Sequence, residues 1–305
     1  MHEDELDLAI EECTKVIALD PKDAEAYRDR GLAYYDKGDY GRAIADFDQA
    51  IALDPHDAES HSDRGLAYYF RGELDRAIAD YHQAILLDPQ LVEAYNNRGT
   101  AYYDTGDLGQ AITDYDRVIA LDPQDADAYY NRGNAYHEMG DLDRAIADFD
   151  QAIALDPMLA PAYNNRGLAH YDRGELDLAI ADYDQAIALD PGSADPYYNR
   201  GNAYASLDEL DQAIADYDHA IALDPQDAGA YFNRGNAYFS LDDMDQAIAD
   251  YGQAIALNPQ DADAHLNRGL AYDNRGDMDQ AIADYDQAMA LDPQDIDVDS
   301  AGGLA

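Results

Sequence analysis

The spacing of the prolines is the feature that most constrains what this chain can fold into. Nine of its 11 prolines lie 34 residues from the next, at Pro21, Pro55, Pro89, Pro123, Pro157, Pro191, Pro225, Pro259 and Pro293. Only Pro161 and Pro196 fall outside this register. A fixed period of about 20–50 residues is typical of stacked supersecondary units. The period therefore predicts one continuous repeat array rather than two independent domains.

Within one repeat, Pro21–Asp54, the residues predict two helices joined by a tight turn. Asp23 can cap the first helix by accepting hydrogen bonds from its free N–H groups. Gly38 can adopt the left-handed conformation that ends this helix, and Asp39 can cap the second one. Pro55 disfavours helical geometry in the residue before it, so the second helix ends there.

The register divides the chain into three parts. Residues 1–20 match the second half of a repeat, and we expect one unpaired helix there. Residues 21–293 hold eight repeats of 34 residues. Residues 294–305 form a short acidic tail, which we expect to be disordered.

Apolar spacing predicts which faces pack. Tyr27, Gly31 and Tyr34 share one face of the first helix. A glycine inside a helix costs about 1 kcal/mol relative to alanine, yet it recurs in every repeat. We therefore expect two helices to approach closely at Gly31, with the ring of Phe47 filling the notch. Two helices cannot bury these faces alone, so neighbouring repeats must stack.

Several small and aromatic residues recur at fixed places in the repeat, namely Tyr27, Gly31, Tyr34, Ala43, Phe47, Ala50 and Pro55. This pattern resembles the tetratricopeptide repeat, and the resemblance covers residues 5–293. It implies an all-α fold, a right-handed superhelical α-solenoid of stacked helix–turn–helix repeats. It also implies a protein–protein interaction scaffold.

One departure from the family pattern recurs throughout the array. Where the family usually places leucine before the glycine, this chain has arginine, and the second helix carries an aspartate at a matching place. We expect ion pairs between Arg30 and Asp46 and between Arg132 and Asp148, with a structural role. Such a partly buried pair can be no more stabilising than the apolar contact that it replaces.

The sequence contains no motif of catalysis or metal binding. It lacks the zinc motif HExxH, a phosphate-binding glycine loop and the Gly-x-Ser-x-Gly elbow. His61, His170 and His265 replace core aromatic residues, and His137 has no second ligand nearby in the pattern. Cys13 is the only cysteine, so no intrachain disulfide or cysteine metal cluster can form. We expect no enzyme activity, no cofactor and no metal.

The C-terminal segment raises one further metal hypothesis. Asp295, Asp297 and Asp299 resemble the start of a calcium loop. The turn glycine and the bidentate glutamate of such a loop are missing, so an acidic tail is the favoured interpretation.

The chain carries a formal net charge of −46. Such a surface repels nucleic acid and anionic lipid, so we expect neither as a partner, and it favours basic partners at low salt. The charge could reflect a high-salt host, although the copying of one acidic motif is favoured. No apolar run of about 18 residues and no basic, apolar leader occurs, and we expect a cytoplasmic protein with no membrane contact.

The first helices carry a surface that packing does not require, and the resemblance implies that it lines a concave groove. From the third repeat onward asparagine recurs there, at Asn97, Asn131, Asn165, Asn199, Asn233 and Asn267, with Asn134, Asn202 and Asn236 one turn further. We call these nine residues the asparagine row. Beside it stand Tyr130, Tyr198 and Phe232.

An asparagine amide offers a donor and an acceptor, so a row of amides can pair with the backbone of an extended peptide. The asparagine row resembles the ladder in the superhelical arm of O-GlcNAc transferases. Aromatic residues are typical interface anchors, which favours binding. The alternative is that the asparagines are solvated copies of one motif.

Three hypotheses for function follow. The first is a non-catalytic scaffold that binds an extended peptide or a partner helix in the groove. The second is a self-assembling module whose ends stack head to tail. The third is the binding arm of an enzyme complex. A lysine clamp for a peptide carboxylate, known in this family, is excluded from the central repeats because no lysine follows Lys37.

Overall fold

In the computed structural model, residues 3–292 are described, and they form seventeen α-helices and no strand. The first helix, α1, spans Glu3–Leu19. The first helices of the eight repeats are α2 (Ala24–Asp36), α4 (Ala58–Phe70), α6 (Val92–Asp104), α8 (Ala126–Glu138), α10 (Ala160–Asp172), α12 (Asp195–Ser206), α14 (Ala228–Ser240) and α16 (Ala262–Arg275). The second helices are α3 (Tyr40–Leu53), α5 (Leu74–Leu87), α7 (Leu108–Leu121), α9 (Leu142–Leu155), α11 (Leu176–Leu189), α13 (Leu210–Leu223), α15 (Met244–Leu257) and α17 (Met278–Leu291).

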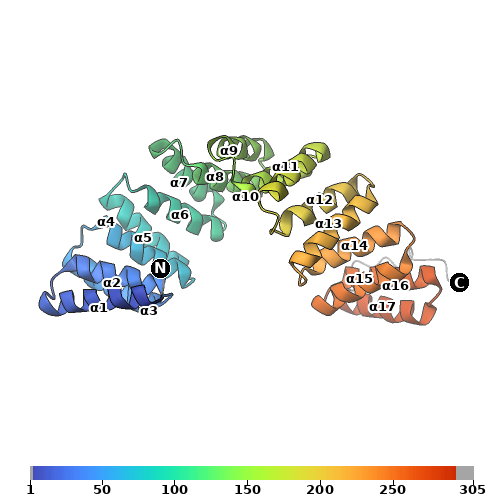
Figure 1. Cartoon of the computed structure of the whole chain (residues 1–305), viewed down its shortest axis with the longest axis horizontal. Coiled ribbons are helices and arrows are strands. Elements are labelled where there is room, and N and C mark those ends of the chain that lie inside the picture. The colour runs from blue at the N-terminus through green and yellow to red at the C-terminus, as the bar shows by residue number, and fades with distance from the viewer. Residues whose placement is uncertain (1–2, 293–305) are drawn as a thin grey trace. The chain divides into compact units, whose positions relative to one another are not determined.

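The chain divides into two compact units, residues 1–157 with α1–α9 and residues 158–305 with α10–α17. Within each unit, every helix packs against the helices that precede and follow it along the chain (Figure 1). The strongest packing joins the two helices of one repeat. Each unit is therefore a stack of helical hairpins, as the period predicts.

Local residue chemistry sets the ends of the helices. The Asp23 carboxylate accepts from the backbone N–H of Ala26 at 2.9 Å, and Asp39 accepts from that of Arg42 at 3.1 Å. Gly38 has a φ of 75°, in the left-handed region. These three predictions are confirmed. In repeats six and seven, however, Asp208 and Asp242 hold the place of this glycine, with φ of 61° and 62°.

The helices of a repeat meet where glycine removes a side chain. A Cβ atom added to Gly31 would lie 2.7 Å from Cε1 of Phe47, so only glycine fits against this ring. The same contact recurs in all eight repeats, and at Gly269 the distance to Cε1 of Tyr285 is again 2.7 Å. Phe47 is fully buried. The expectation of a ring in a glycine notch is confirmed.

The buried ring also joins one repeat to the next. Tyr81 of α5 packs with Ala77 on its own helix and with Ala101 on α6 of the following repeat. Burying a side chain of this size contributes about 1.5–3 kcal/mol per repeat. The all-α repeat solenoid expected from the sequence is confirmed, because this contact stacks the hairpins in order.

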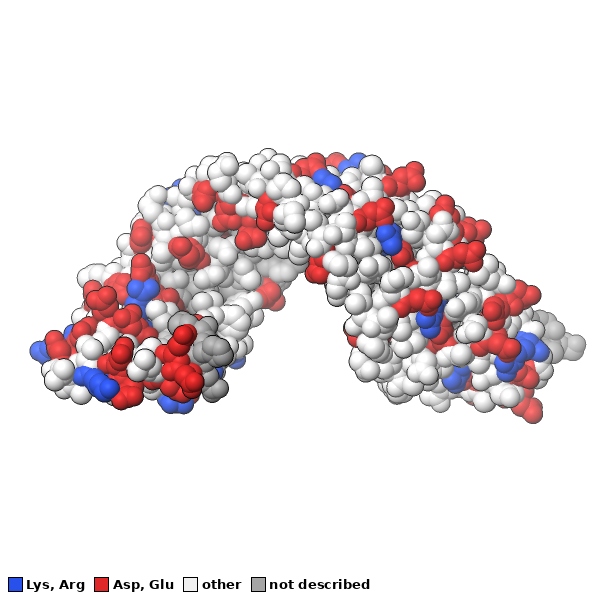
Figure 2. All heavy atoms as spheres, in the orientation of Figure 1, with Lys and Arg blue, Asp and Glu red and all other residues white. Residues whose placement is uncertain are grey.

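Acidic side chains far outnumber basic ones on the visible face, with a dense group over the N-terminal helices (Figure 2). Among the helices of residues 3–292, none combines the length and the apolar character needed to cross a membrane.

Candidate functional site

The recurrent arginines lie between the two helices of each repeat. Nε and one terminal nitrogen of Arg30 donate to the two carboxylate oxygens of Asp46, each at 2.7 Å. Arg132 and Asp148 have the same geometry at the same distances. The aspartates are buried, with Asp46 and Asp148 each 6% exposed. The hydrogen bonds to Asp148 raise the pKa of Arg132, which keeps the guanidinium charged.

The remaining terminal nitrogen of the arginine reaches the preceding repeat. In repeat two, Arg64 pairs with Asp48 at 2.6 Å, and in repeat four Arg132 pairs with Asp116 at 2.5 Å. Such an arginine thus ties together three helices. In repeat eight, Gly252 occupies the place of this aspartate, so Arg268 lacks the carboxylate that Arg64 and Arg132 contact. These ion pairs therefore join helices both within a repeat and between neighbouring repeats.

Members of the asparagine row donate side-chain hydrogen bonds to polar residues of the preceding repeat. In the second unit, Nδ2 of Asn199 donates to Oδ1 of Asn164 at 3.0 Å. Nδ2 of Asn233 donates both to Oη of Tyr198 at 3.0 Å and to Oδ1 of Asn202 at 2.9 Å. In the first unit, the equivalent contact from Asn131 to Asn96 is longer, at 3.4 Å. Members of the row thus donate hydrogen bonds to the preceding repeat in both units.

Buried tyrosines orient two amides of the row. Oη of Tyr217 donates to Oδ1 of Asn202 at 2.8 Å, and Tyr251 donates to Asn236 at the same distance. Nδ2 of Asn267 also donates to Oδ1 of Asn236, at 3.0 Å. Because each of these oxygens already accepts two hydrogen bonds, Asn202 and Asn236 present their NH₂ groups to the surface.

Other repeats lack this partner for the tyrosine. Leucine replaces the asparagine at Leu66, Leu168 and Leu270. The hydroxyls of the tyrosines opposite these leucines are buried and accept or donate no hydrogen bond within residues 3–292, at Tyr81, Tyr183 and Tyr285. Amides that accept a hydrogen bond from a notch tyrosine lie on α12 and α14.

The three aromatic residues beside the row are half-buried and do not stand free. Tyr130 packs against Phe149 with ring centroids 6.1 Å apart, and Tyr198 packs against Tyr217 at 6.1 Å. Phe232 packs in the same way against Tyr251, at 5.8 Å. These rings rest on the ring that fills the glycine notch, so they form a firm floor beside the amides. Asn97, Asn134 and Asn165 are half-buried on α6, α8 and α10.

Two adjoining cavities lie on this surface of the second unit. The larger is about 470 Å³ and is lined by Tyr171, Asn202, Ala205, Ser206, Asp208, Leu210, Tyr217, Asn233, Asn236, Ala237 and Ser240. The smaller is about 240 Å³ and shares Asn236 and Ser240 with the first. The asparagine row predicts part of this lining. Ser206, Asp208 and Ser240 were missed, although their break from the repeat pattern at these places was a usable signal.

The corresponding surface of repeats one and two is filled by an internal ion pair. Arg28 donates to Asp63 at 2.7 Å and also pairs with Glu59. Burial raises the pKa of Asp63 despite this arginine. A cavity of about 270 Å³ remains beside these residues. Since the carboxylates are already paired, this acidic end is less open to a ligand than the second unit.

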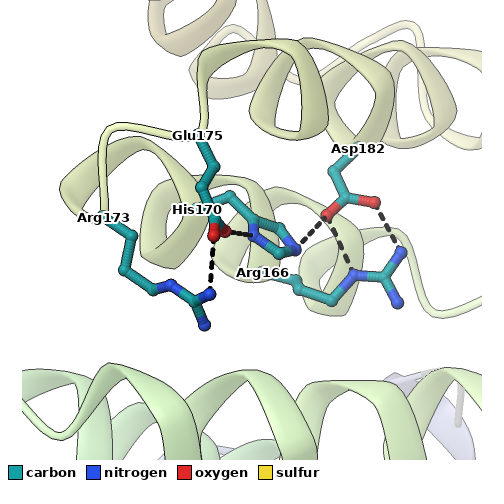
Figure 3. A network of polar contacts seen from close by, with 5 residues as sticks. All are labelled: Arg166, His170, Arg173, Glu175 and Asp182. Carbon is teal, nitrogen blue, oxygen red and sulfur yellow. Dashed lines mark hydrogen bonds and ion pairs between the residues drawn. The ribbon is translucent and has the colours of Figure 1, made fainter.

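The histidine in repeat five joins a local polar network (Figure 3). Nδ1 of His170 lies 2.7 Å from Glu175, and Nε2 lies 3.9 Å from Asp182. Asp182 is held by Arg166, and Glu175 is held by Arg173 at 2.6 Å. The hydrogen bond from His170 lowers the pKa of Glu175. Both ring nitrogens face carboxylates, so this network links α10 to α11.

Within residues 3–292, no group of three or more His, Cys, Asp or Glu side chains is arranged to hold a metal ion. The calcium-loop hypothesis concerns Asp295, Asp297 and Asp299, which lie outside the described residues.

Models of the tetratricopeptide repeat family match almost the whole sequence. The models described as TPR repeat match residues 67–106, 99–140, 167–208, 201–242 and 235–276. Those described as tetratricopeptide repeat match residues 126–159 and 262–295, and a further one matches residues 1–62. The comparison with curated protein sequences gives no significant match.

Three solved structures illustrate the similarity. MamA has 31% identity and a TM-score of 0.51, covering 53% of this chain and 94% of its own. YrrB, described as a TPR protein with an unusual peptide-binding site, has 24% identity and a TM-score of 0.52, covering 59% and 93%. A tetratricopeptide repeat protein from Parabacteroides merdae has 19% identity and a TM-score of 0.64, covering 85% and 98%. The repeat geometry and these matches together show that this chain belongs to the tetratricopeptide repeat family.

Proposed function

We propose that this protein is a non-catalytic scaffold that binds an extended peptide on the asparagine row of its second unit. Tetratricopeptide repeat proteins are generally scaffolds of this kind, and the peptide-binding site named for YrrB is consistent with such a role. One observation carries the proposal, which is the fixed orientation of consecutive amides on α12 and α14.

The orientation gives the surface alternating donors and acceptors. Asn202 presents its NH₂ group, since its oxygen is used twice. Asn233 presents its oxygen, since its NH₂ group donates to Tyr198 and Asn202. An extended peptide backbone offers one C=O and one N–H per residue, so it can satisfy both groups. Because the amides are held by the protein, binding does not have to order them.

The proposal is tested by changing two members of the row. Peptides that bind the full chain are first selected from a random peptide library. Asn199→Ala together with Asn233→Ala should weaken a selected peptide at least tenfold, measured by fluorescence anisotropy. The matched control is Gln185→Ala with Gln253→Ala, which removes two exposed amides from the second helices.

Circular dichroism checks that both double variants remain folded. Unchanged affinity in the asparagine variant, or an equal loss in the glutamine control, would remove the asparagine row as the binding surface.

Self-association is a second candidate, favoured by exposed apolar side chains on the outermost described helices. Leu8 and Val16 of α1 are 54% and 42% exposed, and Ile282 of α17 is 50% exposed. Head-to-tail stacking would cover these residues. Sedimentation over a hundredfold range of concentration tests it, because Leu8→Lys with Ile282→Lys should abolish any mass increase. A constant monomer mass for the unchanged chain would contradict it.

A further inference from the structure

Repeat six departs from the chain's own pattern at two places that lie close together. Near the end of the first helix, most repeats carry an aromatic or histidine ring, such as Tyr171 in repeat five and Phe239 in repeat seven, whereas repeat six has Ala205. Three residues later, six of the eight repeats have a glycine in the turn, whereas repeat six has Asp208.

Both departures line the larger cavity on the asparagine row. Ala205 leaves open the space that a ring occupies in neighbouring repeats, which accounts for the position of the cavity. Leu210 and Ala237 supply apolar walls, and Asn202 and Asn236 lie along the lining. The volume of about 470 Å³ lies within the range of pockets that hold small ligands or side chains.

The hydroxyl groups of this cavity offer acceptors to a ligand, whereas Asn202 and Asn236 offer their NH₂ groups. Oγ of Ser206 donates to the backbone oxygen of Asn202 at 2.9 Å, so Tyr171 must donate in its 3.0 Å contact with Ser206. Oγ of Ser240 likewise donates to the backbone of Asn236 at 3.0 Å. The hydroxyl oxygens therefore keep lone pairs for a ligand.

The charge of the lining also favours a ligand that carries hydrogen-bond donors. Asp208 is the only ionisable carboxyl group among the residues that line this cavity, and no lysine or arginine lines it. An occupant that complements it has several donors, a positive charge and an apolar stem. An arginine side chain has all three, since its guanidinium carries five N–H donors on a hydrocarbon chain.

We propose that this cavity is a specificity pocket for an arginine side chain of the bound peptide, with Asp208 as the counter-charge. This inference rests on the proposed peptide-binding function. The amides of Asn202 and Asn236 hold the peptide backbone at the rim, while the guanidinium donates to Asp208 and the hydroxyl oxygens of Ser240 and Tyr171.

The test uses two blocked heptapeptides, one with a central arginine and one with citrulline, each flanked by three alanines on both sides. Citrulline keeps the shape of arginine and removes its charge. Each peptide is titrated into the ¹⁵N-labelled full chain, and the shifts of the Asn202 and Asn236 side-chain amides are followed by NMR. We expect the arginine peptide to bind at least fivefold more tightly.

Two variants install residues that other repeats of this chain carry at the same places, so they should preserve folding. Asp208→Gly should reduce the preference for arginine to less than twofold. Ala205→Tyr should fill the cavity and weaken the arginine peptide at least tenfold. The control, Asp242→Gly, makes the same change of charge and backbone one repeat later, outside this cavity, and should keep the full preference.

The outcomes separate the two proposals. Equal binding of both peptides, or an equal loss of preference in Asp208→Gly and Asp242→Gly, would overturn the arginine pocket and leave peptide binding intact. Binding of neither peptide, together with no ligand from the random library, would overturn both.

Discussion

Removing one hydroxyl from repeat five should stabilise the protein, whereas removing the equivalent hydroxyl from repeat six should destabilise it. The changes are Tyr183→Phe and Tyr217→Phe. Both rings are buried in glycine notches, at 0% and 1% exposed. They differ in what the hydroxyl meets, because Tyr183 lies opposite Leu168 and Tyr217 donates to Asn202 at 2.8 Å.

The magnitudes follow from these surroundings. A buried hydroxyl without a partner costs about 1–3 kcal/mol of desolvation, and its removal leaves only a small void. Tyr183→Phe should therefore raise the free energy of unfolding by about 1 kcal/mol. Tyr217→Phe removes a hydrogen bond with a net value of about 0.5–1.5 kcal/mol and should lower it by about 1 kcal/mol. Phe149 shows that phenylalanine fits such a notch.

Urea unfolding followed by circular dichroism measures the two changes. Because repeat arrays need not unfold in one step, amide hydrogen exchange in α11 and α13 provides the local free energy of each repeat. Tyr81→Phe is an independent copy of the first change, since its hydroxyl also has no partner within residues 3–292. If Tyr183→Phe and Tyr81→Phe destabilise as much as Tyr217→Phe, the account of the unpaired hydroxyls is wrong.

Three further predictions concern charge. In a double-mutant cycle, Asp148→Ala alone should lower the free energy of unfolding by about 3–5 kcal/mol, because the partly buried Arg132 loses its main partner. Arg132→Ala with Asp148→Ala should cost at least 1 kcal/mol less than the sum of the two single changes. Additivity within about 0.5 kcal/mol in urea unfolding would refute the coupling. Gly252→Asp should give Arg268 the ion pair that Arg64 and Arg132 form with the preceding repeat and raise the free energy of unfolding by up to about 1 kcal/mol. Gly252→Asn is the uncharged control, and equal stability of the two variants would show that the charge is irrelevant. Burial raises the pKa of Tyr115 to about 12, above its value of about 10 in the unfolded chain. The stability that the neutral hydroxyl contributes is therefore complete below pH 10 and is lost as the pH rises toward 12. Absorbance at 295 nm and circular dichroism should show ionisation and unfolding together in that window, and full tyrosine ionisation at pH 10 in the folded chain would contradict this prediction.

The candidate site could be predicted in part. The asparagine row was visible because its members recur at a fixed place on successive helices, and a helix of known phase carries such residues on one face. The aromatic residues beside it were predicted as interface anchors, and the structure adds that Tyr198 and Phe232 are half-buried against the core rings. The exposure of these rings depends on how closely the next repeat approaches, and the spacing of residues in the sequence does not predict that distance.

The repeat, the helix ends and the packing of each hairpin can all be predicted from the amino-acid sequence. These features depend on interactions within one repeat of 34 residues, such as the helix cap at Asp23, the left-handed Gly38 and the notch at Gly31. Which polar groups remain available for a ligand depends instead on how neighbouring repeats pack. Asn202 presents donors and Asn233 an acceptor because a buried tyrosine and a neighbouring repeat use their other atoms. Hydrogen-bond partners are shared between repeats, so the orientation of an amide depends on packing that no single repeat specifies.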